Sequence, residues 1–312
     1  MELRQLEYFM KLSEDLHFTR AAEQLHISQP TLSHQIKVLE GEMGCLLFDR
    51  IGKKISLTEA GHILYEQGLH IFRAIENTKV QINDLDMMQG GALNIGALPG
   101  ELTNLVSNNL VKYHKQFPQV HVAVLSLDDL FGPLKDNKID FAISFAREYK
   151  QSNDEQLIEI PLYTEELLLV AHREHPLMQL ETITLQQVLE QPLVTFPDIQ
   201  QCRQTLDSAA RQEKISLQPI FETSSIEAIF NFVKNHLGVT IISNTLYQLH
   251  KSEEISARSI NHNKLTRQIV LLYRKDKFMS KRVKAYMPIF ILYLKELKIE
   301  VPATSMKQLQ LL

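Results

Sequence analysis

The stretch that decides the fold runs from Ala21 to Gly61 and reads AAEQLHISQPTLSHQIKVLEGEMGCLLFDRIGKKISLTEAG. In it, Ser28 is suited to cap a helix, and Pro30 falls in the first turn, where its missing N–H costs nothing. Apolar side chains then recur at helical spacing, at Leu32, Ile36 and Leu39. The pattern predicts a helix that begins at Ser28 and turns one apolar face inward.

Two shorter helices are expected upstream. The first covers about residues 2–14 and carries the apolar stripe Leu3, Leu6, Phe9, Met10 and Leu12. The second covers residues 20–25, with Thr19 as its N-cap, and Ala21 and Ala22 are small enough to let another helix approach closely. Because only a short turn separates this helix from the one at Ser28, the pair is predicted to form a helix-turn-helix.

Downstream, the sequence predicts a small β element. Residues 46–48 are apolar and fit a buried strand, residues 50–54 form a basic turn that contains Gly52, and residues 55–57 return as a second strand. Three helices followed by such a hairpin are typical of a winged helix-turn-helix, here expected over residues 1–58.

A long helix is predicted next, from Thr58 and Glu59 to about Gln89, where Gly90 and Gly91 end it. Its positions alternate in steps of four and three through Leu64, Gly68, Ile71, Ile75, Thr78, Ile82 and Leu85. This spacing favours a linker helix, residues 59–89, that dimerises through a coiled-coil seam of Leu64, Ile71, Ile75, Ile82 and Leu85. The alternative is a helix that packs only on its own domain.

From Ala92 onward, apolar strands alternate with amphipathic helices. A strand-helix-strand-helix-strand run at residues 93–97, 102–117, 120–125, 130–137 and 139–145 predicts a βαβαβ unit with a parallel sheet. A strand at 166–172 precedes a second such run at residues 193–196, 202–212, 219–222, 226–237 and 239–242. A strand at 268–273 and a helix at 281–297 are expected to rejoin the first lobe. Lobe I then comprises residues 92–162 plus 266–300, and lobe II residues 163–265.

Composition excludes collagen-like, coiled-coil and disordered chains. The 312 residues are 44% hydrophobic and 22% charged, which is typical of a folded globular chain. The N-terminus lacks the basic-then-apolar layout of a signal peptide, and Cys45 and Cys202 make no metal-ligand spacing, so a reducing cytoplasm is expected. The net charge of −4 does not by itself indicate DNA binding, so any DNA contact must come from a local cluster of basic residues.

The stretch Ala21–Gly61 resembles the N-terminal region of LysR-type transcriptional regulators. The residues that carry the resemblance are Ala21-Ala22, the SQPTLS run of residues 28–33, Gln35-Ile36, Leu39-Glu40, Leu47-Phe48 with Arg50, Leu57-Thr58 and Ala60-Gly61. The resemblance implies a winged helix-turn-helix (all-α with a small β wing), a long linker helix and an α/β two-lobed, periplasmic-binding-protein-like effector domain. It also implies a homodimer or homotetramer that binds a partly palindromic double-stranded DNA operator under control of a small-molecule effector. RNA polymerase is a further possible partner, and no cofactor is expected.

The predicted recognition helix presents polar side chains where such a helix meets base edges in the major groove. These DNA-contact candidates are Gln29, Pro30, Thr31, Ser33, His34 and Lys37. Thr19, Arg20 and Arg50 are candidate phosphate contacts, and Lys53 and Lys54 at the wing tip are placed to reach an adjacent minor groove or the backbone. Taken singly, each is more often a solvated surface residue, and Arg50 is also suited to hold the domain together. Many regulators of this type carry Arg where this chain has His34 and Lys53. This difference affects which DNA sequence is expected to be preferred.

Effector contacts are predicted by position. In open α/β sheets, ligands bind beyond the carboxyl ends of strands, often at helix N-termini. The residues found there are Pro99, Gly100, Glu101, Leu102, Thr103, Phe145, Ala146, Thr195, Phe196, Pro197, Gln201, Arg203, Thr223 and Ser224. An interlobe cleft would gather them. The competing interpretation is that Thr223, Ser224 and Ser225 only cap a helix. Glu101 stands near the helix start where related regulators often carry Ser or Thr, so a dianionic effector is less expected.

Catalysis is not expected, because the chain has no GxxxxGK[ST], GxSxG or HExxH motif. The run His172-Arg-Glu-His175 has the wrong spacing for a metal helix and precedes Pro176, so no metal site is predicted there. Two rivals remain. Cys202 beside Arg203 is a candidate redox sensor, although a packed thiol is the commoner outcome. A solute-binding protein would share the two lobes but leave residues 1–90 unexplained.

Overall fold

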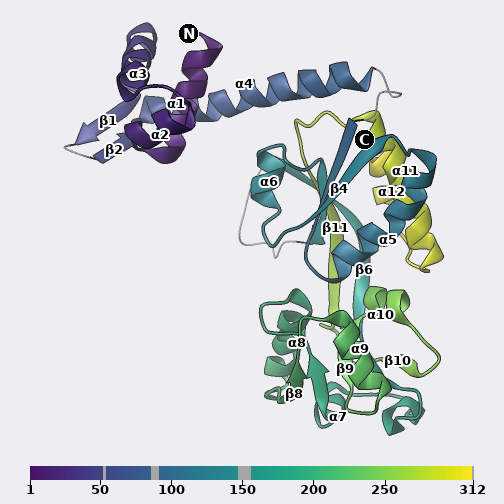
Figure 1. Cartoon of the computed structure of the whole chain (residues 1–312). Helices are drawn as coiled ribbons and strands as arrows, with labels where there is room; N and C mark the ends of the chain where they lie inside the picture. Colours follow the sequence, from purple (N-terminus) through teal and green to yellow (C-terminus); the bar gives the residue numbers. More distant parts are fainter. Residues whose placement is uncertain (52–53, 86–90, 147–155, 311–312) are drawn as a thin grey trace. The chain divides into compact units, whose positions relative to one another are not determined.

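The computed structural model describes residues 1–51, 54–85, 91–146 and 156–310 (Figure 1). The chain divides into two compact units, Met1–Ile82 and Asn83–Leu312. Among the described residues, no helix combines the length and the apolar character needed to cross a membrane.

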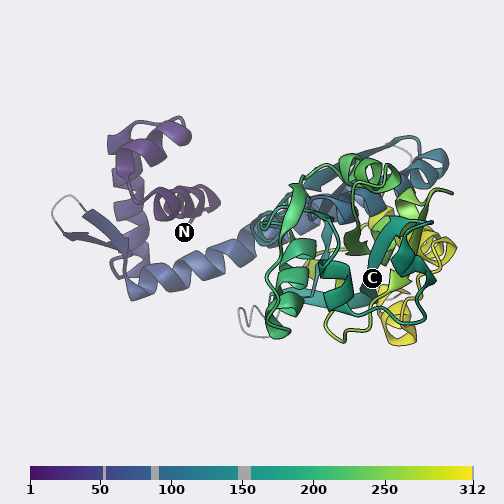
Figure 2. The same cartoon turned by 90° about the horizontal axis from the view of Figure 1, so that it is seen from below.

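The first unit gathers three short helices and a hairpin at one end of a long helix (Figures 1 and 2). Its elements are α1 (Leu3–Asp15), α2 (Phe18–Gln24), α3 (Gln29–Met43), β1 (Phe48–Ile51), β2 (Lys54–Leu57) and α4 (Glu59–Asp84), the last of which ends just beyond the unit boundary. The predicted helix at Ser28 is confirmed: the Ser28 side chain accepts a hydrogen bond from the Thr31 N–H at 3.3 Å, and Pro30 lies in the first turn.

One apolar core holds the three helices together. Leu6, Phe9 and Leu12 of α1 meet Leu32, Ile36 and Leu39 of α3, and all six are at most 1% exposed. Leu47 and Phe48 close this core from the side of the hairpin. The predicted inward face of α3 is therefore confirmed, and its opposite face is left to solvent.

Two local predictions in this unit are wrong. The cap of α2 is His17 and not Thr19, because the His17 side chain accepts the Arg20 N–H at 3.3 Å and Thr19 lies inside the first turn. The first strand of the hairpin begins at Phe48, and Leu46 before it is 65% exposed. Of the three apolar residues 46–48, Leu47 and Phe48 are buried and only Phe48 belongs to the strand.

The carboxylate of Glu40 and a glycine of α4 position the wing. Glu40 is buried near the end of α3, and its Oε1 accepts the backbone N–H groups of Leu47 at 2.9 Å and Phe48 at 3.3 Å. On the other side, a β-carbon at Gly61 would lie 2.2 Å from the Leu47 carbonyl oxygen. These contacts fix the chain just before β1 pairs with β2 in antiparallel register, with Phe48 opposite Leu57.

Helix α4 is shorter than predicted, and its first half packs against its own domain. It ends at Asp84, and residues 86–90 lie outside the described part of the chain. A β-carbon at Gly68 would meet the Met10 sulfur at 2.7 Å, and Leu64 and Ile71 pack against the core of the first unit. These three seam positions therefore contact their own domain. Further along, Ile82 is 61% exposed and Leu85 is 79% exposed.

The second unit has a mixed central sheet with the strand order β10-β6-β11-β5-β3-β4, and β9 also pairs with β6. Its lobe I elements are β3 (Gly91–Ala97), α5 (Glu101–Gln116), β4 (Val120–Ser126), α6 (Phe131–Lys135), β5 (Phe141–Phe145), part of β6 (Leu157–His172), β11 (Thr266–Arg274), α11 (Lys281–Glu296) and α12 (Ala303–Gln310). The parallel βαβαβ prediction is confirmed, because β3 pairs in parallel with β4 and β5.

Lobe II elements follow β6 along the chain. They are a 3-10 turn (Pro176–Gln179), α7 (Leu185–Leu189), β7 (Leu193–Thr195), α8 (Gln201–Gln212), β8 (Pro219–Glu222), α9 (Ile226–Lys234), β9 (Thr240–Ser243), α10 (Asn244–His250) and β10 (Ile255–Ser259). Strands β7 and β8 pair in parallel, as expected for a second α/β unit.

Two long antiparallel strands join the lobes, as Figure 1 shows for β6 and β11. Along β6, Tyr163 belongs to the apolar core of lobe I, whereas Leu167 belongs to that of lobe II. Helix α11 returns to the lobe I core, which confirms the prediction for the C-terminal helix, and α12 adds Leu309 to the same core. The two lobes thus have separate cores and share the two strands that cross between them.

Candidate nucleic-acid interface and effector site

The solvent-facing side of α3 carries the residues predicted to read DNA bases. Ser33 is half-buried, and the other members of this set are exposed: Gln29, Pro30, Thr31, His34 and Lys37. Leu32 and Ile36, which interleave with them, are fully buried. The apolar anchors fix which face of α3 turns outward, so the polar set shares one surface.

The charge distribution on α3 favours an anion near its N-terminus. The first turn has no acidic residue, and the positive end of the helix dipole favours phosphate there. Lys37 adds a positive charge one turn further along. The acidic residues Glu40 and Glu42 come later, where Glu40 holds the wing and Glu42 pairs with the N-terminal amine.

The remaining DNA-contact candidates lie on neighbouring elements. Thr19 and Arg20 are exposed in the first turn of α2. Arg50 belongs to β1 and Lys54 to β2, but their side chains lie outside the described residues, as does Lys53 altogether. A role for the wing in DNA contact therefore stays a prediction.

In lobe I, the carboxyl ends of parallel strands meet the start of α5. The Thr103 hydroxyl donates to the Leu98 carbonyl at 2.9 Å and lies 3.1 Å from the Ser126 hydroxyl, which ends β4. Gly100 precedes the helix with φ of 89°, a conformation that favours glycine. The Leu102 side chain is fully buried in the lobe I core, so only its backbone, in the first turn of α5, is left for the predicted effector contact. The Glu101 side chain lies outside the described residues.

In lobe II, the ends of β7 and β8 bring several candidates together. The Thr223 N–H donates to the Thr195 carbonyl at 3.1 Å, and Thr195 is only 2% exposed. Arg203 of α8 donates to the Phe196 carbonyl at 3.0 Å. Gln201 and Ser224 are exposed nearby in the sequence, and Pro197 is half-buried. The capping alternative holds for Ser225, whose hydroxyl accepts the Ala228 N–H at 3.2 Å at the start of α9, while the Thr223 hydroxyl accepts the Ser225 N–H at 3.1 Å.

Arg203 is held by two carboxylates. Its Nε lies 2.9 Å from Asp207 Oδ1, and its Nη1 contacts the Glu222 carboxylate. Burial by itself lowers the pKa of Arg203, but the bonds and charges of Glu222 and Asp207 outweigh burial and raise it overall. The guanidinium therefore stays charged and already has anionic partners.

A buried charge pair beside Phe145 was missed by the sequence reasoning. The Arg267 guanidinium lies 4.2 Å from the centre of the Phe145 ring and 2.7 Å from Glu165 Oε1. Both charged side chains are almost fully buried, at 8% and 1% exposed, and they face each other across the pairing of β11 with β6. The sequence signal was a run of polar residues, Thr164 to Glu166, that interrupts an apolar strand. Ala146, next to Phe145, donates its N–H to the Gln268 carbonyl at 2.8 Å.

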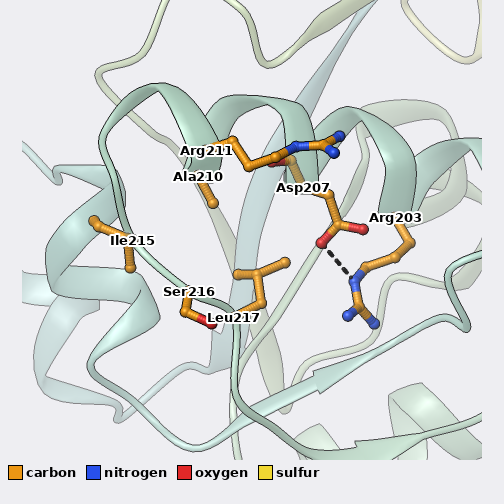
Figure 3. A pocket seen from close by; sticks show the side chains of 7 residues that line it. All are labelled: Arg203, Asp207, Ala210, Arg211, Ile215, Ser216 and Leu217. Atoms are coloured by element: carbon orange, nitrogen blue, oxygen red, sulfur yellow. Dashed lines mark hydrogen bonds and ion pairs between the residues drawn. The ribbon is translucent and has the colours of Figure 1, made fainter.

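Two pockets flank these groups. One, of about 250 Å³, lies along α8, and Figure 3 shows the Arg203–Asp207 bond at its edge; its lining is Arg203, Asp207, Ala210, Arg211, Ile215, Ser216 and Leu217. The other, of about 340 Å³, lies where the lobes join and is lined by Tyr163, Thr164, Glu165, Asn244, Thr245, Lys298, Ile299 and Glu300. The first shares only Arg203 with the predicted effector set.

The thiol of Cys202 is packed inside lobe II. The residue is 5% exposed, and its sulfur lies 3.7 Å from the Ile241 carbonyl oxygen. The chain's other cysteine, Cys45, is exposed in the first unit. Reactive thiols need access and a stabilised thiolate, and the neighbouring Arg203 is occupied by carboxylates. The geometry is that of a packed thiol.

Comparisons with known proteins match both units. The model for bacterial regulatory helix-turn-helix proteins of the lysR family matches residues 3–62, and the model for the LysR substrate binding domain matches residues 88–290. The chain is 30% identical over 244 residues to the hydrogen peroxide-inducible genes activator of Pectobacterium carotovorum, covering 78% of this chain and 80% of the relative. It is 30% identical over 290 residues to a probable RuBisCO transcriptional regulator of Synechocystis, covering 91% of this chain and 84% of that protein.

Solved structures agree in fold. A mutant of OxyR from Corynebacterium glutamicum superimposes with a TM-score of 0.56 at 22% identity, covering 98% of this chain and 95% of the other. At that identity the likeness supports the fold alone. Taken with the family models, which match the units that carry the α3 surface and the two lobes, these findings show that the chain belongs to the LysR family of transcriptional regulators, with a helix-turn-helix domain for DNA and a second domain for a small-molecule effector.

Proposed function

We propose that this regulator acts in the cytoplasm as a homo-oligomer whose α3 helices bind the half-sites of a partly palindromic operator. An effector that binds between the lobes changes the affinity of the regulator for this DNA. The observation that carries the proposal is the exposed polar face of α3, fixed by Leu32 and Ile36 at 0% exposure. The DNA-binding domain is assigned to residues 1–58, the linker to 59–89, lobe I to 92–162 plus 266–300, and lobe II to 163–265.

In this arrangement, α3 enters the major groove and the wing contacts the adjacent backbone. His34 on the exposed face and the half-buried Ser33 are assigned to base edges, with Gln29 and Thr31 beside them. Thr19 and Arg20 at the start of α2 are assigned to phosphates, as are Lys53 and Lys54 of the wing. Base contacts then set which sequence is bound, and phosphate contacts set how tightly any sequence is bound.

Substitutions separate these two kinds of contact. Ser33→Ala and His34→Ala are expected to change the preference among operator variants by about 1 to 3 kcal/mol for each lost base contact. Lys54→Ala is expected to weaken binding to all sequences alike and to reduce the slope of log affinity against log salt by about one. Fluorescence anisotropy with matched and mismatched duplexes at several salt concentrations measures both quantities.

The control for this experiment is Lys79→Ala, because Lys79 on α4 is exposed and pairs only locally with Glu76 at 2.7 Å. It should change neither quantity. Equal losses on every duplex for Ser33→Ala, His34→Ala and Lys54→Ala would contradict the division between base and phosphate contacts.

The effector is assigned to the strand ends of both lobes. Thr103 belongs to lobe I, whereas Thr195 and Thr223 belong to lobe II, and β6 and β11 are the strands that cross between the lobes. In this proposal the lobes change their separation by bending at these two strands. A ligand that binds better to one separation shifts the population toward it. Because Arg203 already pairs with Asp207 and Glu222, the proposed effector bonds chiefly to hydroxyl and backbone groups.

Removing one of these hydroxyls should weaken the response without affecting basal DNA binding. Thr103→Val and Thr223→Val each remove one hydroxyl, at a cost of about 0.5 to 1.5 kcal/mol in effector affinity. A thermal-shift screen of small organic acids and neutral metabolites supplies the effector, and calorimetric titration measures the affinity. Thr184→Val is the control, since Thr184 caps α7 away from the strand ends. Unchanged effector affinity in both site variants would place the ligand elsewhere.

A further inference from the structure

Three metal-ligating side chains meet at the far end of the strand that links the lobes. His172 is the last residue of β6, Glu174 lies in the turn that follows, and His236 follows Asn235, the C-cap of α9. One ligand atom from each of the three lies within 4.8 Å of the other two. The sequence spacing of His172, Glu174 and His175 gave no metal site, because the third member comes from another element.

The turn after β6 presents its two ligands on the same side. The His175 N–H donates to the His172 carbonyl at 2.9 Å and closes the turn. The His172 Nδ1 accepts the Glu174 N–H at 3.3 Å and lies 3.9 Å from Glu174 Oε2. That bond takes the single Nδ1 lone pair, so His172 is left to bind a metal ion through Nε2, while the His175 Nδ1 accepts the Leu177 N–H.

The third ligand occupies a position where glycine is usual. Helix α9 ends with the His236 N–H bonded to Val233 O at 3.2 Å and the Leu237 N–H bonded to Phe232 O at 3.0 Å, the pattern of a Schellman motif. The residue at its C′ position is most often glycine, and His236 stands there with φ of 59°. Its ring lies over that of His172, with centroids 3.7 Å apart.

A small divalent ion fits between the groups once the His236 ring rotates off the His172 ring, because two imidazoles bound to one tetrahedral ion have centroids about 5 Å apart. Ligand atoms about 2.0 to 2.2 Å from a tetrahedral zinc ion lie about 3.4 Å from one another. Glu174 is 69% exposed on its side chain and His236 is exposed, so both can close the remaining distance without moving the backbone. The nearby cation Lys234 pairs with Glu254 at 3.4 Å, which offsets its repulsion of a metal ion.

We propose that His172, Glu174 and His236 bind a divalent transition-metal ion of the zinc class, with water in the remaining position. Two imidazoles and one carboxylate are a known zinc ligand set, and nitrogen ligands disfavour Mg²⁺ and Ca²⁺. The ion ties the end of β6 to the end of α9, two elements that otherwise meet through lobe II packing. This site is separate from the DNA-contact face and from the strand ends assigned to the effector.

The test is calorimetric titration of the full chain, prepared without a histidine tag, with ZnCl₂, and visible absorption with Co²⁺. The wild type should take up one ion in a saturable step, show the absorption bands of nitrogen-coordinated Co²⁺, and gain thermal stability with zinc. His236→Gly should weaken binding by at least about tenfold while keeping the fold, because glycine suits the backbone conformation. Glu174→Gln should weaken it in the same direction.

The matched control is His262→Ala. His262 Nε2 lies 3.6 Å from Glu213 Oε1, so this pair offers the same residue types without a third ligand among the described residues. The control should bind zinc as the wild type does. Failure of the wild type to bind zinc, equal binding by His236→Gly, or an equal loss in His262→Ala would each overturn the proposal.

Discussion

Replacing Glu40 with alanine should lower the free energy of unfolding of the first unit by about 3 to 6 kcal/mol and abolish operator binding. The Glu40 carboxylate accepts two buried N–H groups, from Leu47 and Phe48, and a hydrogen bond to a charged group contributes about 1.5 to 3 kcal/mol. Without it, both donors stay buried and unpaired at the start of the wing. Hydrogen exchange of a peptide covering residues 44–58, measured by mass spectrometry, should report faster exchange before any global unfolding.

Two variants give this prediction its controls. Glu40→Gln keeps a carbonyl oxygen at the position of the accepting atom and should recover more than half of the lost stability. Glu42→Ala removes an exposed carboxylate whose partner is the N-terminal amine, and it should leave wing exchange unchanged. If Glu40→Ala exchanges like the wild type over residues 44–58, the carboxylate does not hold the wing.

Charges on the second half of α4 and just beyond it should break the dimer and weaken operator binding by about 10²- to 10⁴-fold, the range expected when two linked half-site contacts become one. Of the residues predicted to form the seam, Ile82 at 61% exposure and Leu85 at 79% are the most exposed in the single chain. Ile82→Asp with Leu85→Asp places like charges against their symmetry mates. Analytical ultracentrifugation should show the loss of one association step, and anisotropy should show the loss of affinity.

Gln81→Asp is the matched control, since it adds a charge to an exposed polar position on the same turn. It should keep both the oligomeric state and the affinity. The seam lies elsewhere if the chain with both Ile82→Asp and Leu85→Asp keeps its oligomeric state and its full operator affinity. Ile71 is unsuited to this test, because it packs on the core of its own unit and its replacement would also destabilise the helices.

The first unit was largely predictable because its signals are local. The Ser28 cap, Pro30 in the first turn and the Leu32–Ile36 spacing all act within one or two helical turns, and the structure confirms each. The parallel βαβαβ order followed from alternating periodicity in the same way. Thr19 was misplaced because a histidine also caps a helix when its ring nitrogen reaches the right N–H, and residue preference alone does not reveal that.

Features that depend on distant contacts were not predictable from spacing. Gly68 belongs to the heptad pattern of α4, yet Met10 of α1 occupies the space that a partner helix would need. Leu102 stands at a helix start where ligands often bind, yet its side chain enters the lobe I core. The Glu165–Arg267 pair and the approach of His236 to His172 arise only when strands or elements far apart in the sequence meet.

Selection of genomic DNA fragments by the purified full chain tests the central claim most directly. The enriched fragments should share one two-fold-symmetric sequence with half-sites separated by one or more helical turns, roughly 34 Å each. The Ser33→Ala and His34→Ala chains, which keep the buried anchors Leu32 and Ile36, should enrich this sequence less strongly. Enrichment of no common sequence, or an unaltered preference in both variants, would contradict sequence-specific recognition by α3.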